Sequence, residues 1–350
     1  MREKLKVIKT GITDPYHNLA LEELLTEDIG EEEILLYLWQ NRHTVVIGRN
    51  QNAYRECRIK TLAADGGFLA RRLSGGGAVY HDAGNLCFSF IAQEKNYDVD
   101  RHQAVLLHAL RRLSLNAEKT GRNDLVLDGK KFSGHAFFRR GTHCCHHGTL
   151  MLDVDTERLT RYLTPDPEKT AKHLSMEERS SIDRAVPSVR SRVVNLKAYL
   201  PHLTAERLSE ELLLAFSDVF GAEVRPFEET RIDPGKLNER RKFFADPSWI
   251  LGRQIAHTVC MKRRFPAGGL ELMLQVQDGK VADAVLYTDA LSGDAETAAK
   301  QLCGCAFEKE TLIRALQPLY GGAERPLAEM LAVLIREELK DRTKNGEEYV

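Results

Sequence analysis

At 350 residues the chain is long enough for two domains, and its 43% content of hydrophobic residues is ordinary for a globular protein. A formal net charge of −1 excludes a general electrostatic attraction to nucleic acid or to an anionic membrane. The sequence has no apolar signal core after Met1 and no apolar run of about 18 residues, so we expect a cytoplasmic protein without a membrane segment.

The first two thirds of the chain mix helical and strand patterns. Apolar residues at helical spacing predict helices over residues 18–25, 103–113 and 205–220. Short apolar runs predict strands over residues 34–39, 44–47, 68–73, 86–92, 125–127 and 148–152. This interleaving favours an α+β fold with mixed α/β character. The polar segment 165–187 is interpreted either as a mobile surface loop or as a solvated helix.

A change of pattern near residues 233–249 indicates a second domain. Asp233-Pro234-Gly235 predicts a turn, and a charged run follows at 238–242. Alternating segments at 270–276 and 281–287, joined at Asp278-Gly279, predict a β-hairpin, and helices are predicted over 295–302, 309–316 and 327–339. We therefore expect a first domain over 1–245, a small α+β domain over 246–340 and a charged tail over 341–350.

The seven cysteines, an odd number in a large chain, indicate reduced thiols rather than a disulfide framework. Cys303 and Cys305 do not have the C-x-x-C spacing of a zinc ribbon, which favours small buried thiols over a metal site there. The run 143–147 contains histidines and cysteines, but neighbours in a strand point to opposite faces, so they cannot all bind one ion.

The most informative segment, 69–82, contains the glycine triplet Gly75-Gly76-Gly77. Glycines let a backbone approach a ligand closely and turn its N–H groups toward an anion. Arg71 and Arg72 precede the triplet and add guanidinium groups suited to phosphate or carboxylate. The segment is neither a P-loop nor a dinucleotide fingerprint. We expect it to bind a charged, phosphorylated small molecule; an ordinary surface turn is the alternative.

A second informative segment, 121–134, predicts a β-hairpin closed by Asp128-Gly129. A regular register gives four cross-strand pairs: Leu127–Lys130, Val126–Lys131, Leu125–Phe132 and Asp124–Ser133. Bulges near the strand ends could change the orientation of Asp124 and Ser133. In the regular register Lys131 lies on the face opposite the core, and we expect its side chain to point into a site.

These segments occur in the order seen in lipoate–protein ligases, and the chain resembles that family. The resemblance rests on the glycine segment, on the hairpin residues 123–124 and 131–134, and on His146-His147-Gly148-Thr149-Leu150. It extends to residues 18–23, 45–52 and 188–193, and from about Trp249 onward to the family's small accessory domain. It implies a biotin/lipoate ligase-like catalytic domain, built on a mixed sheet with flanking helices, plus a small α+β C-terminal domain.

The resemblance also implies a reaction in two steps. ATP and lipoate form lipoyl-AMP with release of pyrophosphate, and a lysine of a carrier then takes the lipoyl group while AMP leaves. The implied carriers are apo lipoyl domains of 2-oxo acid dehydrogenase E2 subunits and the glycine cleavage H protein. Mg²⁺ is expected with the ATP.

Site residues follow from the resemblance together with the residue chemistry. Lys131 is the expected catalytic residue, because its ammonium group can bridge a carboxylate and an α-phosphate. The expected ATP and lipoyl-AMP ligands are Arg71, Ser74, Gly75, Gly76, Gly77, Ala78, Val79, Asn123, Asp124 and Lys131. The expected lipoate ligands are Arg71, His81, Lys131, Ser133, Gly134, His147 and Gly148. Asp124 is interpreted either as a Mg²⁺ ligand or as a salt-bridge partner of Lys131.

Cys144 and Cys145 stand just before the His-His-Gly segment, where the family pattern leads us to expect an aromatic residue. Acyl-transferring proteins of the same fold work through a cysteine thiolate, so an octanoyl or lipoyl transferase that needs no ATP is one alternative. A lipoate-binding protein without catalytic activity is another. We favour two buried strand cysteines and an ATP-dependent ligase.

Overall fold

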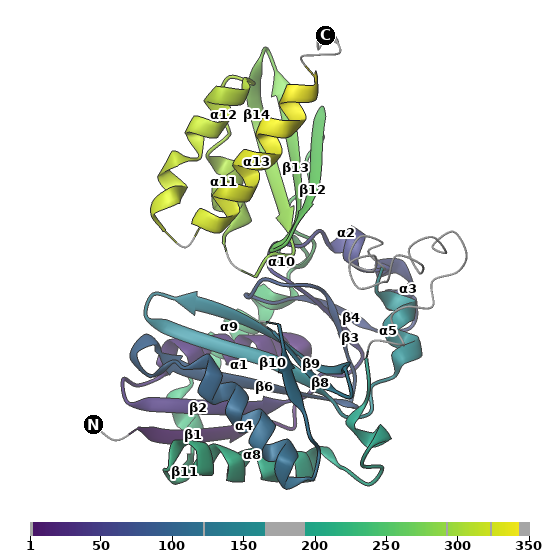
Figure 1. The fold of residues 1–350 in the computed structure, drawn as a ribbon, viewed down its shortest axis with the longest axis vertical. Helices are drawn as coiled ribbons and strands as arrows, with labels where there is room; N and C mark the ends of the chain where they lie inside the picture. Colours follow the sequence, from purple (N-terminus) through teal and green to yellow (C-terminus); the bar gives the residue numbers. More distant parts are fainter. Residues whose placement is uncertain (1–2, 122, 165–192, 292, 323, 343–350) are drawn as a thin grey trace. The chain divides into compact units, whose positions relative to one another are not determined.

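The computed structural model describes residues 3–121, 123–164, 193–291, 293–322 and 324–342 (Figure 1). The chain forms two compact units. The first comprises Met1–Val46, Arg55–Arg71 and Val79–Ile250, and the second comprises Ile47–Tyr54, Arg72–Ala78 and Leu251–Val350. Two short segments from the first 245 residues therefore belong to the same unit as the C-terminal part, and one of them contains the glycine triplet.

A mixed sheet of eight strands, in the order β11-β1-β2-β6-β10-β9-β8-β7, forms the centre of the first unit. Strand β1 pairs in parallel with β2 and β11, whereas the remaining pairs are antiparallel. The strands are β1 (Lys4–Lys9), β2 (Glu33–Trp39), β6 (Asn85–Gln93), β7 (Glu118–Thr120), β8 (Asp124–Leu127), β9 (Lys130–Arg140), β10 (His143–Met151) and β11 (Val224–Pro226). The expected α+β class with a mixed sheet is confirmed.

Helices lie against this sheet in two packed pairs (Figure 1). Helices α4 (Val99–Arg112) and α8 (Ala205–Phe220) pack on each other, and α1 (Pro15–Asp28) packs on α9 (Pro234–Ala245). Helix α8 has the limits predicted from the sequence, because Thr204 caps its first turn and Gly221 ends it in the left-handed conformation at φ 64°.

A smaller sheet in the order β4-β3-β5 contains β4 (Phe68–Arg71), β3 (Thr44–Ile47) and β5 (Val79–His81). The short helices of this part of the chain are α2 (Ala53–Glu56), α3 (Ile59–Ala64), α5 (Thr156–Tyr162) and α10 (Pro247–Leu251). The described residues of this part also form the 3-10 turns η1 (Glu94–Asn96), η2 (Leu196–Ala198) and η3 (Glu229–Arg231).

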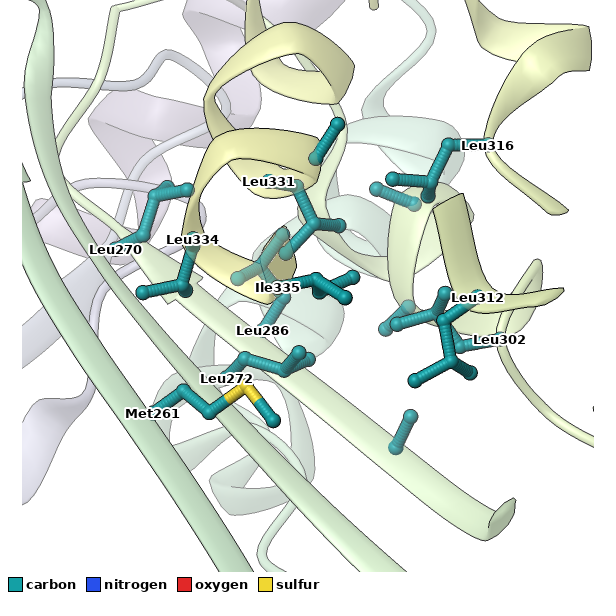
Figure 2. Packing of buried hydrophobic residues seen from close by; sticks show 14 of the residues in the cluster. Met261, Leu270, Leu272, Leu286, Leu302, Leu312, Leu316, Leu331, Leu334 and Ile335 are labelled. Atoms are coloured by element: carbon teal, nitrogen blue, oxygen red, sulfur yellow. The ribbon is translucent and has the colours of Figure 1, made fainter. Parts of the chain in front are cut away.

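The second unit has its own sheet, β12-β13-β14, and its own core (Figure 2). Its strands are β12 (Val259–Phe265), β13 (Gly268–Gln277) and β14 (Lys280–Thr288); its helical elements are α11 (Ala295–Lys300), α12 (Lys309–Ala315), η4 (Gln317–Gly321) and α13 (Arg325–Arg342). Leu272 and Leu286 of the sheet pack with Leu331 and Ile335 of α13, all fully or almost fully buried. The hairpin predicted around Asp278-Gly279 is confirmed.

One predicted turn is wrong. Asp233 is the N-cap of α9, since its carboxylate accepts from the N–H groups of Gly235 and Lys236, and Pro234 occupies the first helical position. Asp-Pro suits a helix start as well as a turn. The segment 165–187 lies outside the described residues, as does the tail from 343 onward. Within the described part of the chain, no helix is long and apolar enough to cross a membrane.

Candidate active site

The predicted hairpin forms around a two-residue turn in which Asp128 and Gly129 have φ angles of 49° and 72°. Lys131 pairs with Val126, as predicted. One residue further the register shifts, because Phe132 is an extra residue in β9. The predicted Leu125–Phe132 and Asp124–Ser133 pairs are therefore wrong: the structure has Leu125–Ser133 and Asp124–Gly134.

The bulge brings Lys131, Asp124 and Gly134 together on one face. Lys131 Nζ lies 2.7 Å from Asp124 Oδ1, and the two side chains are 42% and 37% exposed. A Cβ atom added to Gly134 would come within 3.0 Å of the same Nζ. Of the two interpretations of Asp124, this geometry matches the salt-bridge partner.

Ser133 lies on the opposite face, because cross-strand partners share a face and successive residues of β8 alternate. Its side chain is 1% exposed, and its Oγ is 3.0 Å from His135 Nε2. His146 Nε2 lies 3.0 Å from His135 Nδ1, and His102 of α4 contacts the other ring nitrogen of His146 at 3.3 Å. A ligand beside the Lys131 ammonium group therefore cannot reach the Ser133 hydroxyl, only its main chain.

Strand pairing extends the face that carries Lys131 across the centre of the sheet. Ala136 pairs with His147, His147 with Ser89, and Ser89 with Tyr37. The neighbouring rows on this face contribute Trp39, Cys87 and Cys145. We call this surface the Lys131 face; it comprises Tyr37, Trp39, Cys87, Ser89, Asp124, Lys131, Gly134, Ala136, Cys145 and His147.

A buried carboxylate of α1 organises the polar groups on the Lys131 face. Glu22 Oε1 is 2.5 Å from Ser89 Oγ and 2.8 Å from His147 Nδ1, and Trp39 Nε1 donates to Ser89 Oγ at 3.1 Å. Glu22 is 2% and Ser89 0% exposed. A carboxylate with two close partners can be retained in a protein interior, and it holds the imidazole of His147 in one orientation.

One helical turn before Glu22, Asn18 organises a second histidine. The amide of Asn18 accepts from Tyr37 Oη at 3.2 Å and donates to Asn41 Oδ1 at 3.0 Å. Asn41 Nδ2 then lies 3.2 Å from His81 Nδ1, so donation from this amide leaves the His81 proton on Nε2. Because residues four apart share one side of a helix, Asn18 and Glu22 direct both histidines from α1.

The cysteines on the Lys131 face are not activated. Burial raises the pKa of the Cys87 and Cys145 thiols well above its usual value, and the nearby Glu22 raises both further. Glu22, Cys145 and His147 could together offer a metal three ligand atoms within 4.8 Å of one another. A protonated thiol and a carboxylate already bonded to two side chains make this a poor cation site.

Two further predicted residues contribute through the main chain. A Cβ atom on Gly148 would lie 2.6 Å from Phe88 Cζ and 2.7 Å from the Gly134 carbonyl oxygen, so only glycine fits between these groups. The carbonyl of Asn123 accepts from the N–H of His135 at 2.8 Å, which extends the pairing of β8 and β9.

Arg71 is 3% exposed at the end of β4. Its Nε lies 2.9 Å from the carbonyl oxygen of Trp249 and 3.0 Å from that of Ile250. The indole N–H of Trp249 donates back to the Arg71 carbonyl at 3.0 Å. Arg71 therefore fixes α10 against β4, and this contact is a role that the sequence did not suggest.

The glycine triplet lies in the second unit and is held by its neighbours there. Arg72 Nη2 donates to the carbonyls of Gly75 and Gly77 at 2.6 and 2.8 Å, and Arg72 Nε donates to Ser74 Oγ at 2.9 Å. A Cβ atom on Gly75 would come within 2.4 Å of the Ala290 carbonyl oxygen.

The N–H of Gly76 is also used within the second unit, since it donates to the Ala290 carbonyl at 3.2 Å. Gly76 has a φ angle of 88°, which favours glycine. The triplet thus serves close packing in the structure, in addition to the anion binding that we expect of it. Ala78 and Val79, which follow it, are half-buried, and Val79 pairs with Val46.

Sequence reasoning missed Glu22, Ser89 and Asn18 as site residues. Each is a buried polar residue next to apolar residues of its own helix or strand. That pattern is the available signal, because a polar group within an apolar run needs a buried partner. Which partner it finds depends on the fold, and Glu22 is 125 residues from His147 in the sequence.

Comparison with known proteins agrees with this geometry. The family model "Lipoyl protein ligase A/B catalytic domain" matches residues 14–217, and the model "Bacterial lipoate protein ligase C-terminus" matches residues 254–326. The first match alone covers more than half of the chain. It contains every residue of the Lys131 face as well as the glycine triplet.

Solved structures show the same fold. P. falciparum LipL1 in complex with lipoate is 25% identical over 96% of this chain and 99% of its own, with a TM-score of 0.77. A bi-partite lipoate protein ligase from Thermoplasma acidophilum is 23% identical over 74% and 100%, with a TM-score of 0.60. Lipoate-protein ligase A bound with ATP is 22% identical over 72% and 99%, also with a TM-score of 0.60. The chain belongs to the lipoyl protein ligase A/B family.

Proposed function

We propose that this protein activates lipoate with ATP to form lipoyl-AMP and then transfers the lipoyl group to a lysine of an apo lipoyl domain. The observation that carries the proposal is the Lys131 ammonium group, held beside Asp124 and over Gly134 on a face that continues to His147. Similarity to structures with bound lipoate and with bound ATP supports both substrates.

In the first step, a carboxylate oxygen of lipoate attacks the α-phosphorus of ATP, and pyrophosphate leaves. Two anions must approach each other, so a fixed positive charge between them lowers the barrier. Lys131 is proposed to supply that charge. Mg²⁺ is proposed to enter with ATP as part of the substrate, with Asp124 as a protein oxygen available to it.

In the second step, the ε-amine of the carrier lysine attacks the carbonyl carbon of lipoyl-AMP. An amide bond forms, AMP leaves, and the amine loses a proton. Proposed carriers are lipoyl domains of 2-oxo acid dehydrogenase E2 subunits and the glycine cleavage H protein. The T. acidophilum ligase belongs to a lipoylation system described with its E2 lipoyl domain, which supports a carrier of this kind.

Lipoate is proposed to lie along the Lys131 face, with its carboxylate at Lys131 and its chain toward His81 and His147. Main-chain groups of Gly134 and Gly148 would border it. Arg71 and the segment Ser74 to Val79 are proposed to bind the phosphates of ATP and of lipoyl-AMP. The transferase alternative needs a thiolate here, whereas burial keeps Cys87 and Cys145 protonated.

Pyrophosphate release from the purified protein tests the proposal. Release should require ATP, Mg²⁺ and lipoate together. Transfer of a lipoyl group between carriers without ATP would instead support the transferase. Binding of lipoate without pyrophosphate release would support a binding protein.

A further inference from the structure

The main chain at Lys131 has neighbours on both sides. Val126 of β8 pairs with it on one side. On the other side the pairing of β9 with β10 reaches only to His135, and the chain beyond residue 192 takes the vacant position. Val193 forms a parallel bridge with Lys131, and the N–H of Val194 donates to the Lys131 carbonyl at 2.9 Å.

The side-chain amide of Asn195 fastens this segment to the rest of the first unit, and the ammonium group of Lys197 adds an ion pair with Asp153 at 3.0 Å. Asn195 Oδ1 accepts from the N–H of Val154 at 3.0 Å, and Asn195 Nδ2 donates to the Val154 carbonyl at 2.9 Å. The amide therefore binds both main-chain polar groups of one residue, as a neighbouring strand would. The buried Leu196 follows it, and the N–H of Lys197 donates to the Leu152 carbonyl at 3.1 Å.

The segment 152–155, to which Asn195 binds, is itself held by hydrogen bonds. The N–H groups of Leu152 and Asp153 both donate to the Gly84 carbonyl, at 2.9 and 2.8 Å. A Cβ atom on Gly84 would lie 2.0 Å from the Asp153 carbonyl oxygen, so the two segments are in close contact. Asp82 Oδ2 accepts from the N–H of Asp155 at 2.9 Å. Asn195 thus links the main chain at Lys131 to the segment 152–155, which also binds the loop after His81.

We infer that Asn195 is a positioning residue for Lys131 in adenylate formation, acting through the main chain of Val193 and Val194. The inference rests on the proposed function. Lys131 has a long side chain that is 42% exposed, so the position of its main chain limits where its ammonium group can be placed. A misplacement of about 1 Å can cost roughly a hundredfold in rate. We expect Asn195→Ala to slow adenylation at least about tenfold.

Single-turnover formation of lipoyl-AMP, with full-length enzyme in excess over lipoate, tests the inference. At enzyme concentrations that saturate the rate, partial unfolding leaves the rate constant unchanged as long as the folded enzyme remains in saturating excess over lipoate. Asn195→Ala should lower the rate constant. Asn195→Asp, which keeps the acceptor oxygen and the size but loses the donor, should lower it too. Asn96→Ala is the matched control, because Asn96 Nδ2 donates to the Glu31 carbonyl at 2.7 Å, outside the segments that hold Lys131, and it should keep the wild-type rate constant.

The same measurement in a Lys131→Ala background shows whether Asn195 acts through the lysine. There, adding Asn195→Ala should change the residual rate constant less than twofold. A full further loss in that background would overturn the inference, as would wild-type rate constants for both Asn195 variants. If the wild-type protein forms no lipoyl-AMP, the proposed function fails as well. If it is active and the Asn195 variants match it, only this inference fails.

Discussion

Gly134 lies directly beneath the ammonium group of Lys131: a Cβ atom at Gly134 would come 3.0 Å from Nζ and 3.1 Å from Cε. The contact exists because Phe132 bulges out of β9 and brings both residues to one face. Asp124, which pairs with Gly134, reaches the same nitrogen at 2.7 Å. The position of the Lys131 amine therefore depends on the absence of a side chain at Gly134 as well as on the negative charge of Asp124.

Gly134→Ala should displace the Lys131 ammonium group while preserving the fold, because the end of a lysine side chain moves at little cost. Adenylate formation should fall about tenfold or more, by the sensitivity of catalysis to displacements of about 1 Å. The melting temperature should stay within a few degrees of the wild type. Single-turnover kinetics and thermal unfolding check the two expectations, and a wild-type rate in the folded variant would contradict the role of this contact.

Lys131→Ala should remove most adenylate formation, with a loss of about 2.7–4 kcal/mol of transition-state stabilisation, or roughly 10²–10³ in rate. Lys130→Ala is the matched control, since Lys130 is the exposed neighbour of Lys131 and the first residue of β9. Lipoate-dependent formation of lipoyl-AMP measures both variants. Equal losses in the two would refute a specific role for Lys131.

Glu22→Ala should destabilise the first unit, because it leaves the buried Ser89 hydroxyl and His147 ring without their shared acceptor. An unsatisfied buried polar group costs about 1–3 kcal/mol, so the loss in unfolding free energy should exceed about 2 kcal/mol. Glu27→Ala, at an exposed position of the same helix, should cost much less. Urea unfolding of the two variants compares these costs, and similar midpoints would show that the Glu22 network contributes little.

Acid should destabilise the protein through its buried histidines. Burial lowers the pKa of His102 and of His135 to about 3, and it lowers that of His146 well below the usual value. Below about pH 6.5 the unfolded chain binds protons that the folded protein does not, so stability falls between about pH 6.5 and pH 3. Each histidine should contribute up to about 1.4 kcal/mol per pH unit in this window.

His102→Phe tests the acid effect, because His102 stacks on Phe90 with ring centroids 4.6 Å apart and a phenyl ring fits that stack. The unfolding free energy should fall less steeply between pH 7 and pH 4 in this variant. The change in slope should correspond to about one fewer proton taken up on unfolding. A wild-type slope in His102→Phe would contradict the assignment.

Local signals accounted for much of the fold. The spacing of apolar residues predicts helix α8 over its whole length, and the Asp128-Gly129 turn follows from its two residues. Helix α9 was missed since Asp233-Pro234-Gly235 fits both a turn and a helix start. The choice between those structures depends on tertiary packing, which a local pattern does not contain.

The site was predictable only in part, and for the same reason. Lys131 and Asp124 follow from one hairpin, but the bulge at Phe132 that joins them to Gly134 has no clear sequence signature. Glu22 meets His147 through packing of α1 on the sheet, far apart in sequence. Arg71 was predicted to hold phosphate, and its contacts with Trp249 and Ile250 become visible only in the structure.

The most direct measurement is the intact mass of an apo lipoyl domain after incubation with the purified protein, lipoate and Mg²⁺, with and without ATP. We expect one lipoyl group on the domain when ATP is present, no change without ATP, and no change with Lys131→Ala in the same time. An unmodified domain with ATP present, or a lipoylated one without it, would contradict ATP-dependent ligation.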